Sequence, residues 1–214
     1  MKAQGNGSIT YGTLNHTYAS AGIYTVKGKY WFDNQNLNWA FYVSKIIKTP
    51  EVPIDGYYKF NKSKYLTYAN LTNATFTNAR STFNAYECKS VLKTIIFNNT
   101  TFDCAEVDGF LNACISLESV DVSGINFTSK VQNISSFFMG CTKLTEIIGI
   151  ETWNVSQIKT FQNMFNNCQL LSNFSFVKSW DMSSAENIAG MFSKTGVETM
   201  SFPPLFFYGI FVQK

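Results

Sequence analysis

Histidine is almost absent from this chain of 214 residues, and charged residues make up only 14% of it. With His16 as the single imidazole, acid–base designs built on histidine, including serine and cysteine triads, are disfavoured. The chain also lacks a glycine-rich phosphate loop and any Cys-x-x-Cys pair, which removes the common phosphate-binding, zinc and redox motifs. We therefore predict that the protein is not an enzyme and needs no cofactor.

Charge of one sign is not concentrated anywhere in the chain. The formal net charge is +3 and the lysines are scattered, so the sequence predicts no nucleic-acid partner and no polybasic membrane-binding segment. The apolar run Leu205–Val212 is too short to span a bilayer. Asp103, Glu106 and Asp108 form a small acidic cluster, which we interpret as a solvated loop and not as a metal site.

What the sequence does contain is an internal repeat of 27 residues. Four columns share this spacing: Cys114, Cys141 and Cys168; Phe138, Phe165 and Phe192; Leu117, Leu144 and Leu171; Trp153 and Trp180. Weaker copies at a spacing of 26 residues extend the pattern upstream through Cys88 and Leu66. A fixed period of about 20 to 50 residues is typical of solenoids, in which each unit buries its apolar face against its neighbours.

Each repeat contains a strand pattern followed by a helix pattern. Leu117, Val120 and Val122 illustrate the strand pattern. Val120 and Val122 are two residues apart and point inward, while Ser119 and Asp121 point outward, as in a β-strand. Ser183 followed by Glu186 forms a capping box, as does Ser129 followed by Gln132. Apolar residues then follow at helical spacing, at Ile158, Phe161, Met164 and Phe165 and again at Ala185, Ile188, Met191 and Phe192. We predict a right-handed α/β solenoid of 26–27-residue coils, with at least five parallel strands on one face.

The two best repeats resemble a known family. Met164–Phe192 reads MFNNCQLLSNFSFVKSWDMSSAENIAGMF, and Phe137–Phe165 is a good second copy. The unit resembles the BspA-like leucine-rich repeats of bacterial and protist surface proteins, approximately Met-Phe-x-x-Cys-x-x-Leu-x-x-hydrophobic and then Trp-Asp-x-Ser. The resemblance covers roughly Lys62 to Phe202. It implies a leucine-rich-repeat solenoid used for adhesion or molecular recognition, and it supplies no catalytic residue.

The repeats are flanked by two segments of different character. Residues 1–50 are predicted to form a β-rich cap, in which His16–Val26, HTYASAGIYTV, resembles the last strands of a polycystic-kidney-disease-type (PKD) β-sandwich. Only 15 residues precede His16, so a complete sandwich does not fit. The cap then shields the first coil, or it is completed by a strand of another chain that docks on it. We interpret residues 51–61 as a linker, 62–202 as the solenoid and 203–214 as an apolar tail that caps the last coil or docks another chain.

The first residues, MKAQGNGSITYG, lack the apolar core of a secretory signal. This leaves two interpretations. In one, a signal has been removed; in the other, the protein reaches its site by another route, such as assembly on a virus particle.

The periodic cysteines are predicted to be reduced and buried. Cys114, Cys141 and Cys168 occupy equivalent sites, and side chains in one column of parallel strands point the same way. We therefore expect space-filling thiols and not disulfides. Phe165, in a neighbouring column, is expected to be a central core residue.

The strand register also predicts a concave strip of exposed residues. It consists of Tyr68, Asn70, Thr94, Ile96, Ser119, Asp121, Glu146, Ile148, Asn173, Ser175, Thr199 and Ser201. Solenoids commonly bind along such a strip, and a mostly uncharged, polar surface with apolar anchors at Tyr68, Ile96 and Ile148 favours a protein or glycan ligand.

Two functions fit these features. The first is a recognition or adhesion module that is extracellular or at the cell surface. The alternative is a structural virion component, such as a capsid-decoration or fibre-base protein, that uses the solenoid as a spacer. For the second, we expect a location on the virion surface.

Overall fold

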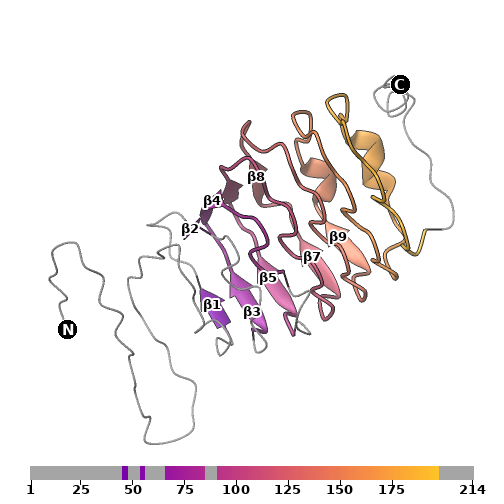
Figure 1. The fold of residues 1–214 in the computed structure, drawn as a ribbon. Coiled ribbons are helices and arrows are strands. Elements are labelled where there is room, and N and C mark those ends of the chain that lie inside the picture. The colour runs from indigo at the N-terminus through magenta and orange to yellow at the C-terminus, as the bar shows by residue number, and fades with distance from the viewer. Residues whose placement is uncertain (1–44, 48–53, 56–65, 85–90, 198–214) are drawn as a thin grey trace, which may run out of the picture. The chain divides into compact units, whose positions relative to one another are not determined.

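The computed structural model describes residues 45–47, 54–55, 66–84 and 91–197, all of which belong to the compact unit Phe32–Lys214 (Figure 1). Their strands form two parallel sheets. The first sheet has the order β1-β3-β5-β7-β9, with strands Lys45–Ile47, Tyr68–Asn70, Thr94–Ile96, Ser119–Asp121 and Glu146–Ile148. The second has the order β2-β4-β6-β8, with strands Ile54–Asp55, Thr75–Asn78, Thr100–Phe102 and Ile125–Phe127. Among the residues that the structure describes, the helical elements are two 3₁₀ helices, η2 (Ile150–Thr152) and η3 (Ser175–Ser179).

The strand register follows the sequence repeat. Tyr68 pairs with Thr94 in the first sheet, and Phe76 pairs with Phe102 in the second. Neighbouring strands in a sheet are thus one repeat apart, an arrangement compatible with a repeat solenoid. β1 and β2 lie in the predicted cap and linker, yet they pair in parallel with β3 and β4. Both sheets therefore begin upstream of Lys62.

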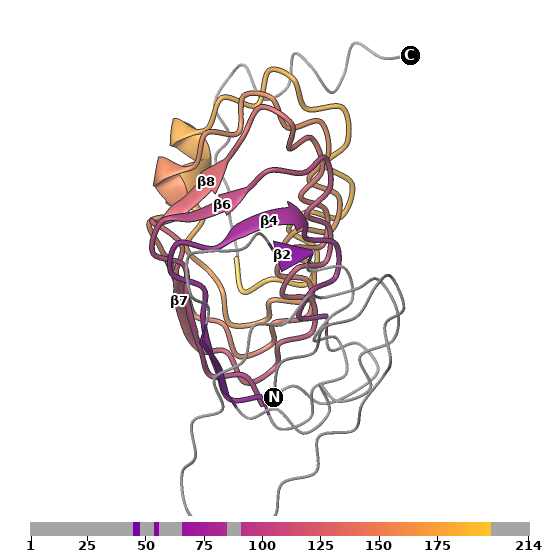
Figure 2. The ribbon, with the colours of Figure 1, turned by 90° about the vertical axis from the view of Figure 1, so that its left-hand side faces the viewer.

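The second sheet was not predicted from the sequence. Phe76 and Phe102 point inward from β4 and β6, are fully buried and stack with ring centroids 5.2 Å apart. Figure 2 shows β2, β4, β6 and β8 stacked above one another, with the two helical turns beside β8. Threonine and phenylalanine, which are enriched in strands, supply these segments.

The predicted short helices are wrong for the residues that the structure describes. Their place is taken by consecutive tight turns at residues 107–113, 134–140, 161–167 and 188–194, which we call the turn ladder. Asn163 and Asn167 have positive φ values of 56° and 63°, and equivalent residues in other coils, such as Gly109 and Gly140, share this conformation. A left-handed residue every fourth position is incompatible with an α-helix, whereas asparagine and glycine tolerate it in turns.

Backbone hydrogen bonds explain the stability of the turn ladder. The N–H groups of Phe161, Asn163 and Phe165 donate to carbonyls of the next coil over 2.8–2.9 Å. Between them, Met164 and Asn166 donate to carbonyls three residues earlier, at 3.0 Å each. Alternate amides thus join neighbouring coils and close turns, so the backbone is satisfied without a helix.

The predicted capping boxes are also wrong. The Ser183 N–H donates to Asp181 Oδ1 over 3.0 Å, and the Glu186 N–H donates to the Lys159 carbonyl over 2.7 Å. Asn154 accepts the Ser156 N–H in the same way, at 3.2 Å. The Trp-Asp-x-Ser pattern therefore encodes an Asx turn. In this turn the side-chain oxygen of Asp or Asn accepts a hydrogen bond from the N–H two residues later, as a backbone carbonyl does in an ordinary turn.

The apolar columns of the sequence form a continuous core. Phe165 is fully buried, as predicted, and stacks between Phe138 and Phe192 with ring centroids 5.8 and 5.9 Å apart. Trp153 and Trp180 are parallel within 5°, and the Trp180 Nε1–H donates to the Ile150 carbonyl over 3.0 Å. Each column therefore connects one coil to the next.

The first sheet stops earlier than the repeat does. Four of its strands, β3, β5, β7 and β9, lie within the predicted solenoid, and the fifth, β1, lies upstream of it. The strand predicted across Phe174 and Phe176 is missing, because η3 begins at Ser175. Phe176 and Val177 are both buried, which fits a helical turn and not the alternation of a strand.

Candidate functional site

The outward residues of the first sheet form two rows, which we call the outer strip. One row contains Tyr68, Thr94, Ser119 and Glu146, and the other contains Asn70, Ile96, Asp121 and Ile148. The residues between the rows, such as Ala69 and Val120, are buried. Asn173 and Ser175 follow in the next coil as exposed residues outside the sheet, and the predicted members Thr199 and Ser201 lie outside the described residues.

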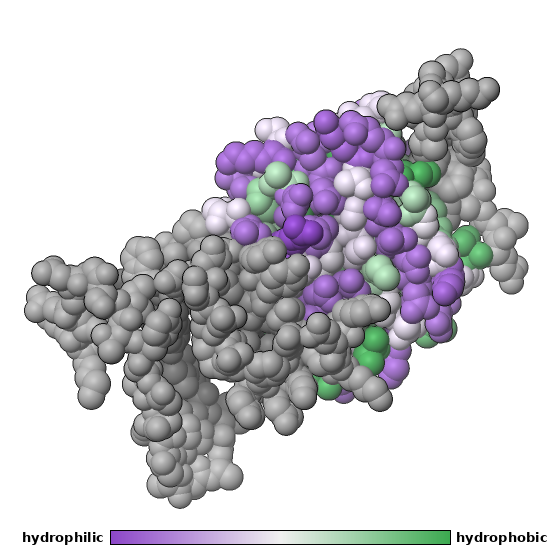
Figure 3. All heavy atoms as spheres, viewed as in Figure 1, coloured by the Kyte–Doolittle hydropathy of each residue, from purple (hydrophilic) through white to green (hydrophobic). Residues whose placement is uncertain are grey.

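The members of the outer strip differ in exposure. Ile148 is 47% exposed, and Tyr68 and Ile96 are half-buried, so the three predicted anchors do not protrude equally. The polar members from Thr94 onward are exposed. Figure 3 shows that the described surface in this view is largely hydrophilic, with hydrophobic residues in small separate patches.

Two polar side chains of the outer strip, Asn70 and Asp121, and Asn173 in the next coil are already used by turns. Asn70 Oδ1 accepts the Thr72 N–H and Asn173 Oδ1 accepts the Ser175 N–H, both over 3.0 Å. Asp121 Oδ1 accepts bonds from the hydroxyl and the N–H of Ser123, at 2.6 and 2.9 Å. These two bonds hold the pKa of Asp121 below its ordinary value. The three side chains have a structural role that the sequence reasoning did not assign.

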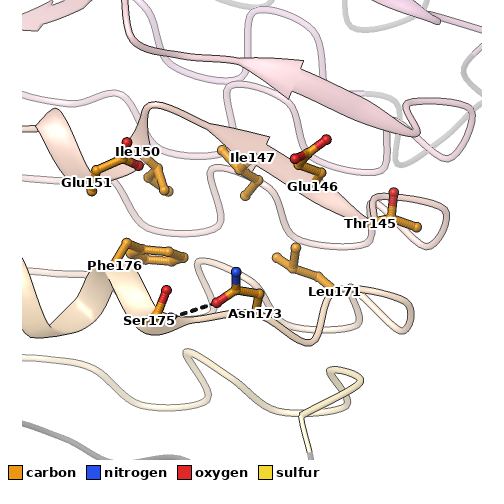
Figure 4. Close-up of a pocket in the computed structure, with 9 residues that line it drawn as sticks. All are labelled: Thr145, Glu146, Ile147, Ile150, Glu151, Leu171, Asn173, Ser175 and Phe176. Carbon is orange, nitrogen blue, oxygen red and sulfur yellow. Dashed lines mark hydrogen bonds between the residues drawn. The ribbon is translucent and has the colours of Figure 1, made fainter.

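A hollow opens where the first sheet ends. It has a volume of about 290 Å³ and is lined by Thr145, Glu146, Ile147, Ile150, Glu151, Leu171, Asn173, Ser175 and Phe176 (Figure 4). Ile147 and Leu171 point toward each other from opposite sides, while Glu146 and Glu151 lie on either side of the isoleucines. An adjoining depression of about 390 Å³ adds Lys178 and Ser179 along η3. We call the first of these the β9 hollow.

The β9 hollow exists because one Asx turn comes early. In the coil with β7, the turn begins at Asp121, the last residue of the strand. Two repeats later the equivalent position is Ser175, but the turn begins at Asn173, where the strand would start. Of the nine lining residues, the sequence predicted Glu146, Asn173 and Ser175 as binding residues, and Leu171 only as a member of a repeat column. The Asn173-x-Ser175 triplet lies two residues earlier in its repeat than the turn residues of the β7 coil. This shift is the sequence signal for the missing strand and for the other lining residues.

The carboxylates of the β9 hollow have no ion-pair partner among the described residues. Neither Glu146 nor Glu151 lies within 4.0 Å of a lysine or arginine nitrogen there, whereas the exposed pair Lys159 and Glu186 is 3.4 Å apart. Both glutamates are exposed residues at the rim. The hollow therefore combines an apolar floor with two carboxylates that are free to bind a cation.

The acidic cluster predicted to be solvated is held by ion pairs instead. Asp103 accepts a bond from Lys130 Nζ at 2.7 Å, which holds the pKa of that carboxyl below its ordinary value. Arg80 contacts Glu106 at 3.5 Å and Asp108 at 3.1 Å. Burial raises the pKa of Asp108 despite this cation. Within the described ranges, no group of three or more metal-ligating side chains comes together.

Cys114, Cys141 and Cys168 are free and buried, as predicted, and Cys104 is free and buried as well; Cys88 lies outside the described residues. The thiols of Cys141 and Cys168 donate to carbonyls of the preceding coil, at 3.2 and 3.0 Å. Burial raises the pKa of Cys168 to about 12 and that of Cys104 to about 11. Because the thiolate is the reactive form, these side chains are inert packing groups near neutral pH.

Comparisons with known proteins add one finding. A family model described as "Mycoplasma protein of unknown function, DUF285" matches residues 106–199, which is less than half of the chain and includes the repeats with the strict 27-residue spacing. No curated protein and no solved structure matches the sequence. In the part of the chain that the structure describes, no helix has the length and apolar character needed to cross a membrane.

Proposed function

We propose that this chain is a non-catalytic recognition or adhesion module, built on a right-handed leucine-rich-repeat solenoid of the BspA-like kind. It acts outside the cell or on the cell surface and binds a protein or a glycan. The observation that carries the proposal is the outer strip, because side chains from four coils stand in register on one exposed face. Repeat proteins commonly use such a surface to contact one ligand with many coils.

The strip has the composition expected of a protein interface with a small apolar centre. Ile148 and the half-buried Ile96 lie in one row with Asp121 between them. Exposed Thr94, Ser119 and Glu146 form the polar row beside them. Interfaces commonly combine a few desolvated anchors with a polar rim, and the isoleucines provide the anchors here.

The proposal is tested on protein and glycan arrays probed with the full chain and with a variant in which Tyr68, Ile96 and Ile148 are all replaced by serine. We expect the variant to lose binding to the ligands that the natural chain captures. Leu170→Ser serves as the control, because Leu170 is 56% exposed but lies outside the strip. Thermal unfolding is measured in parallel to show that each variant is folded. The single variant Ile148→Ser repeats the test at the most exposed of the three anchors, where the substitution perturbs the fold least. Full retention of binding by a folded triple variant would place the site elsewhere.

A structural spacer in a virion is the second candidate, and one observation favours it. Asn70, Asp121 and Asn173 use their side chains to hold turns, which reduces the polar groups that the strip can offer a ligand. In this case, contacts to other chains are made by the predicted cap or the apolar tail, both largely outside the described residues. If the chain is such a spacer, the triple serine variant is incorporated into virus particles as efficiently as the natural chain. The arrays then show no ligand whose binding is lost in the triple serine variant.

A further inference from the structure

We propose that the β9 hollow is a socket for one arginine side chain of a partner protein. This inference rests on the proposed recognition function, and it assigns a place and a chemistry to one contact. The hollow takes the aliphatic part of the arginine on its floor and the guanidinium at its rim.

The break in the sheet leaves an opening for such a side chain. β9 is the last strand of the first sheet in the described part of the chain. No backbone hydrogen bond joins β9 to Asn173–Ser179. The two coils are connected elsewhere, by the hydrogen bond from the Trp180 indole to the Ile150 carbonyl and by the parallel β-bridge between Thr160 and Asn187. The two coils thus separate locally at β9 and stay joined on the other sides. The opening is a fixed feature of the stack and does not need a moving loop.

The volume of the β9 hollow itself suits one long side chain. At about 290 Å³ it is just below the roughly 300–1,000 Å³ typical of small-molecule sites. A helix or a folded loop does not fit into such a space. A long side chain that projects from a partner surface does.

The lining selects a chain that is apolar along its length and cationic at its end. Ile147, Ile150 and Leu171 provide the floor, on which the methylene groups of arginine can pack. Glu146 and Glu151 supply two carboxylates with no ion-pair partner among the described residues. Lys178 lines only the adjoining depression and lies more than 4.0 Å from both carboxylates. Arginine matches this arrangement best, because its planar guanidinium donates two parallel hydrogen bonds to one carboxylate. Glu146 and Glu151 lie on opposite sides of Ile147 and Ile150, so one guanidinium at the rim pairs with one of them (Figure 4).

Other ligand classes fit less well. An anion would approach two carboxylates, and no cation lines the hollow. A sugar ring is usually held against the exposed face of an aromatic side chain. Phe176 is the one aromatic lining residue, and it is 8% exposed and packed against Trp180 with ring centroids 4.9 Å apart.

The test uses two matched peptides, Ac-Gly-Arg-Gly-NH₂ and the same peptide with neutral citrulline in place of arginine. Each is titrated into the ¹⁵N-labelled full chain, and amide shifts are followed by NMR. We expect the arginine peptide to shift the amides of the β9 hollow and the citrulline peptide to shift them far less. The double variant Glu146→Gln, Glu151→Gln should raise the Kd of the arginine peptide about tenfold or more, since charged hydrogen bonds are lost.

A matched control keeps the net charge equal. The double variant Glu118→Gln, Glu186→Gln removes the same charge from exposed positions outside the hollow and should bind like the natural chain. Unchanged amide positions away from the substituted residues show that both variants are folded. Equal shifts with citrulline, shifts confined to another surface, or an unchanged Kd in the hollow variant would each overturn the proposal.

The two proposals fail separately. The array experiment uses Tyr68, Ile96 and Ile148, none of which lines the hollow. Loss of array binding in the triple serine variant together with no arginine-dependent shift rejects the socket alone. An arginine-dependent shift together with full array binding by the triple variant rejects the outer strip alone.

Discussion

The turn ladder and the first sheet run along the same coils, but only the turn ladder continues to the end of the described stack. Bonds between coils in the turn ladder extend from Val107 to Ser193, whereas the sheet ends at β9. Buried phenylalanines in the turn ladder, and the thiols that directly follow it, connect each coil to the previous one. The outward side of the sheet has no such column. The difference indicates that side-chain columns enforce the period, and that the strand side can diverge without loss of the stack.

The largest effect should come from removing one member of a turn-ladder column. Phe165→Ala should lower the free energy of unfolding by about 3–5 kcal/mol, because Phe165 is fully buried and stacks on both neighbouring coils. Denaturant unfolding measures the change. Leu170→Ala is the control at an exposed position and should change stability by less than about 0.5 kcal/mol. If Phe165→Ala lowered the free energy of unfolding by less than about 1 kcal/mol, the side-chain columns of the turn ladder would not be what holds neighbouring coils together.

A smaller effect should appear at alkaline pH. Burial raises the pKa of Cys168 from 9.0 to about 12, so the unfolded chain loses this proton at a lower pH than the folded chain. The stability from the neutral thiol is fully present below about pH 9 and is lost as the pH rises toward 12. At pH 10 the loss should be on the order of 1 kcal/mol.

The measurement compares denaturant midpoints at pH 8 and pH 10 in the natural chain and in Cys168→Ala. Other groups also titrate in this range, so the prediction concerns the difference between the two chains. The variant should lose less stability than the natural chain on going to pH 10. Equal losses in both chains, or fast labelling of Cys168 at pH 8 without denaturant, would show that the thiol is accessible.

The sequence predicted the stack and its columns better than the local backbone. A strict 27-residue spacing requires equivalent environments, which is why the burial of Phe165, the free thiols and the parallel register all followed from it. The predicted helices failed because apolar residues three and four apart also fit two successive tight turns. Asn163 and Asn167, four residues apart, were the evidence for turns, since both adopt the left-handed conformation.

The candidate site could be predicted only in part. The rows of the outer strip follow from strand alternation, so Glu146 and Ile148 were found. The β9 hollow depends on Glu151 and Leu171, which come together because the strand after β9 is absent. A repeat predicts what coils have in common, and this opening is the place where one coil departs from the others.

The smallest effects should separate two asparagines on the two sides of the stack. Asn163→Ala, in the turn ladder, should cost about 1 kcal/mol, because alanine is strained at a φ of 56° and the bond from Asn166 Nδ2 is lost. Asn163→Gly should stay within about 0.5 kcal/mol of the natural chain, since glycine already occupies the equivalent position at Gly109 and Gly190. Asn173→Ala, at the end of the sheet, removes one exposed turn bond and should cost only about 0.5 kcal/mol, with Asn173→Asp nearly neutral. Denaturant unfolding of the four variants gives the ranking. A larger loss at Asn173 than at Asn163 would mean that the strand side, and not the turn ladder, fixes the spacing of the last coils.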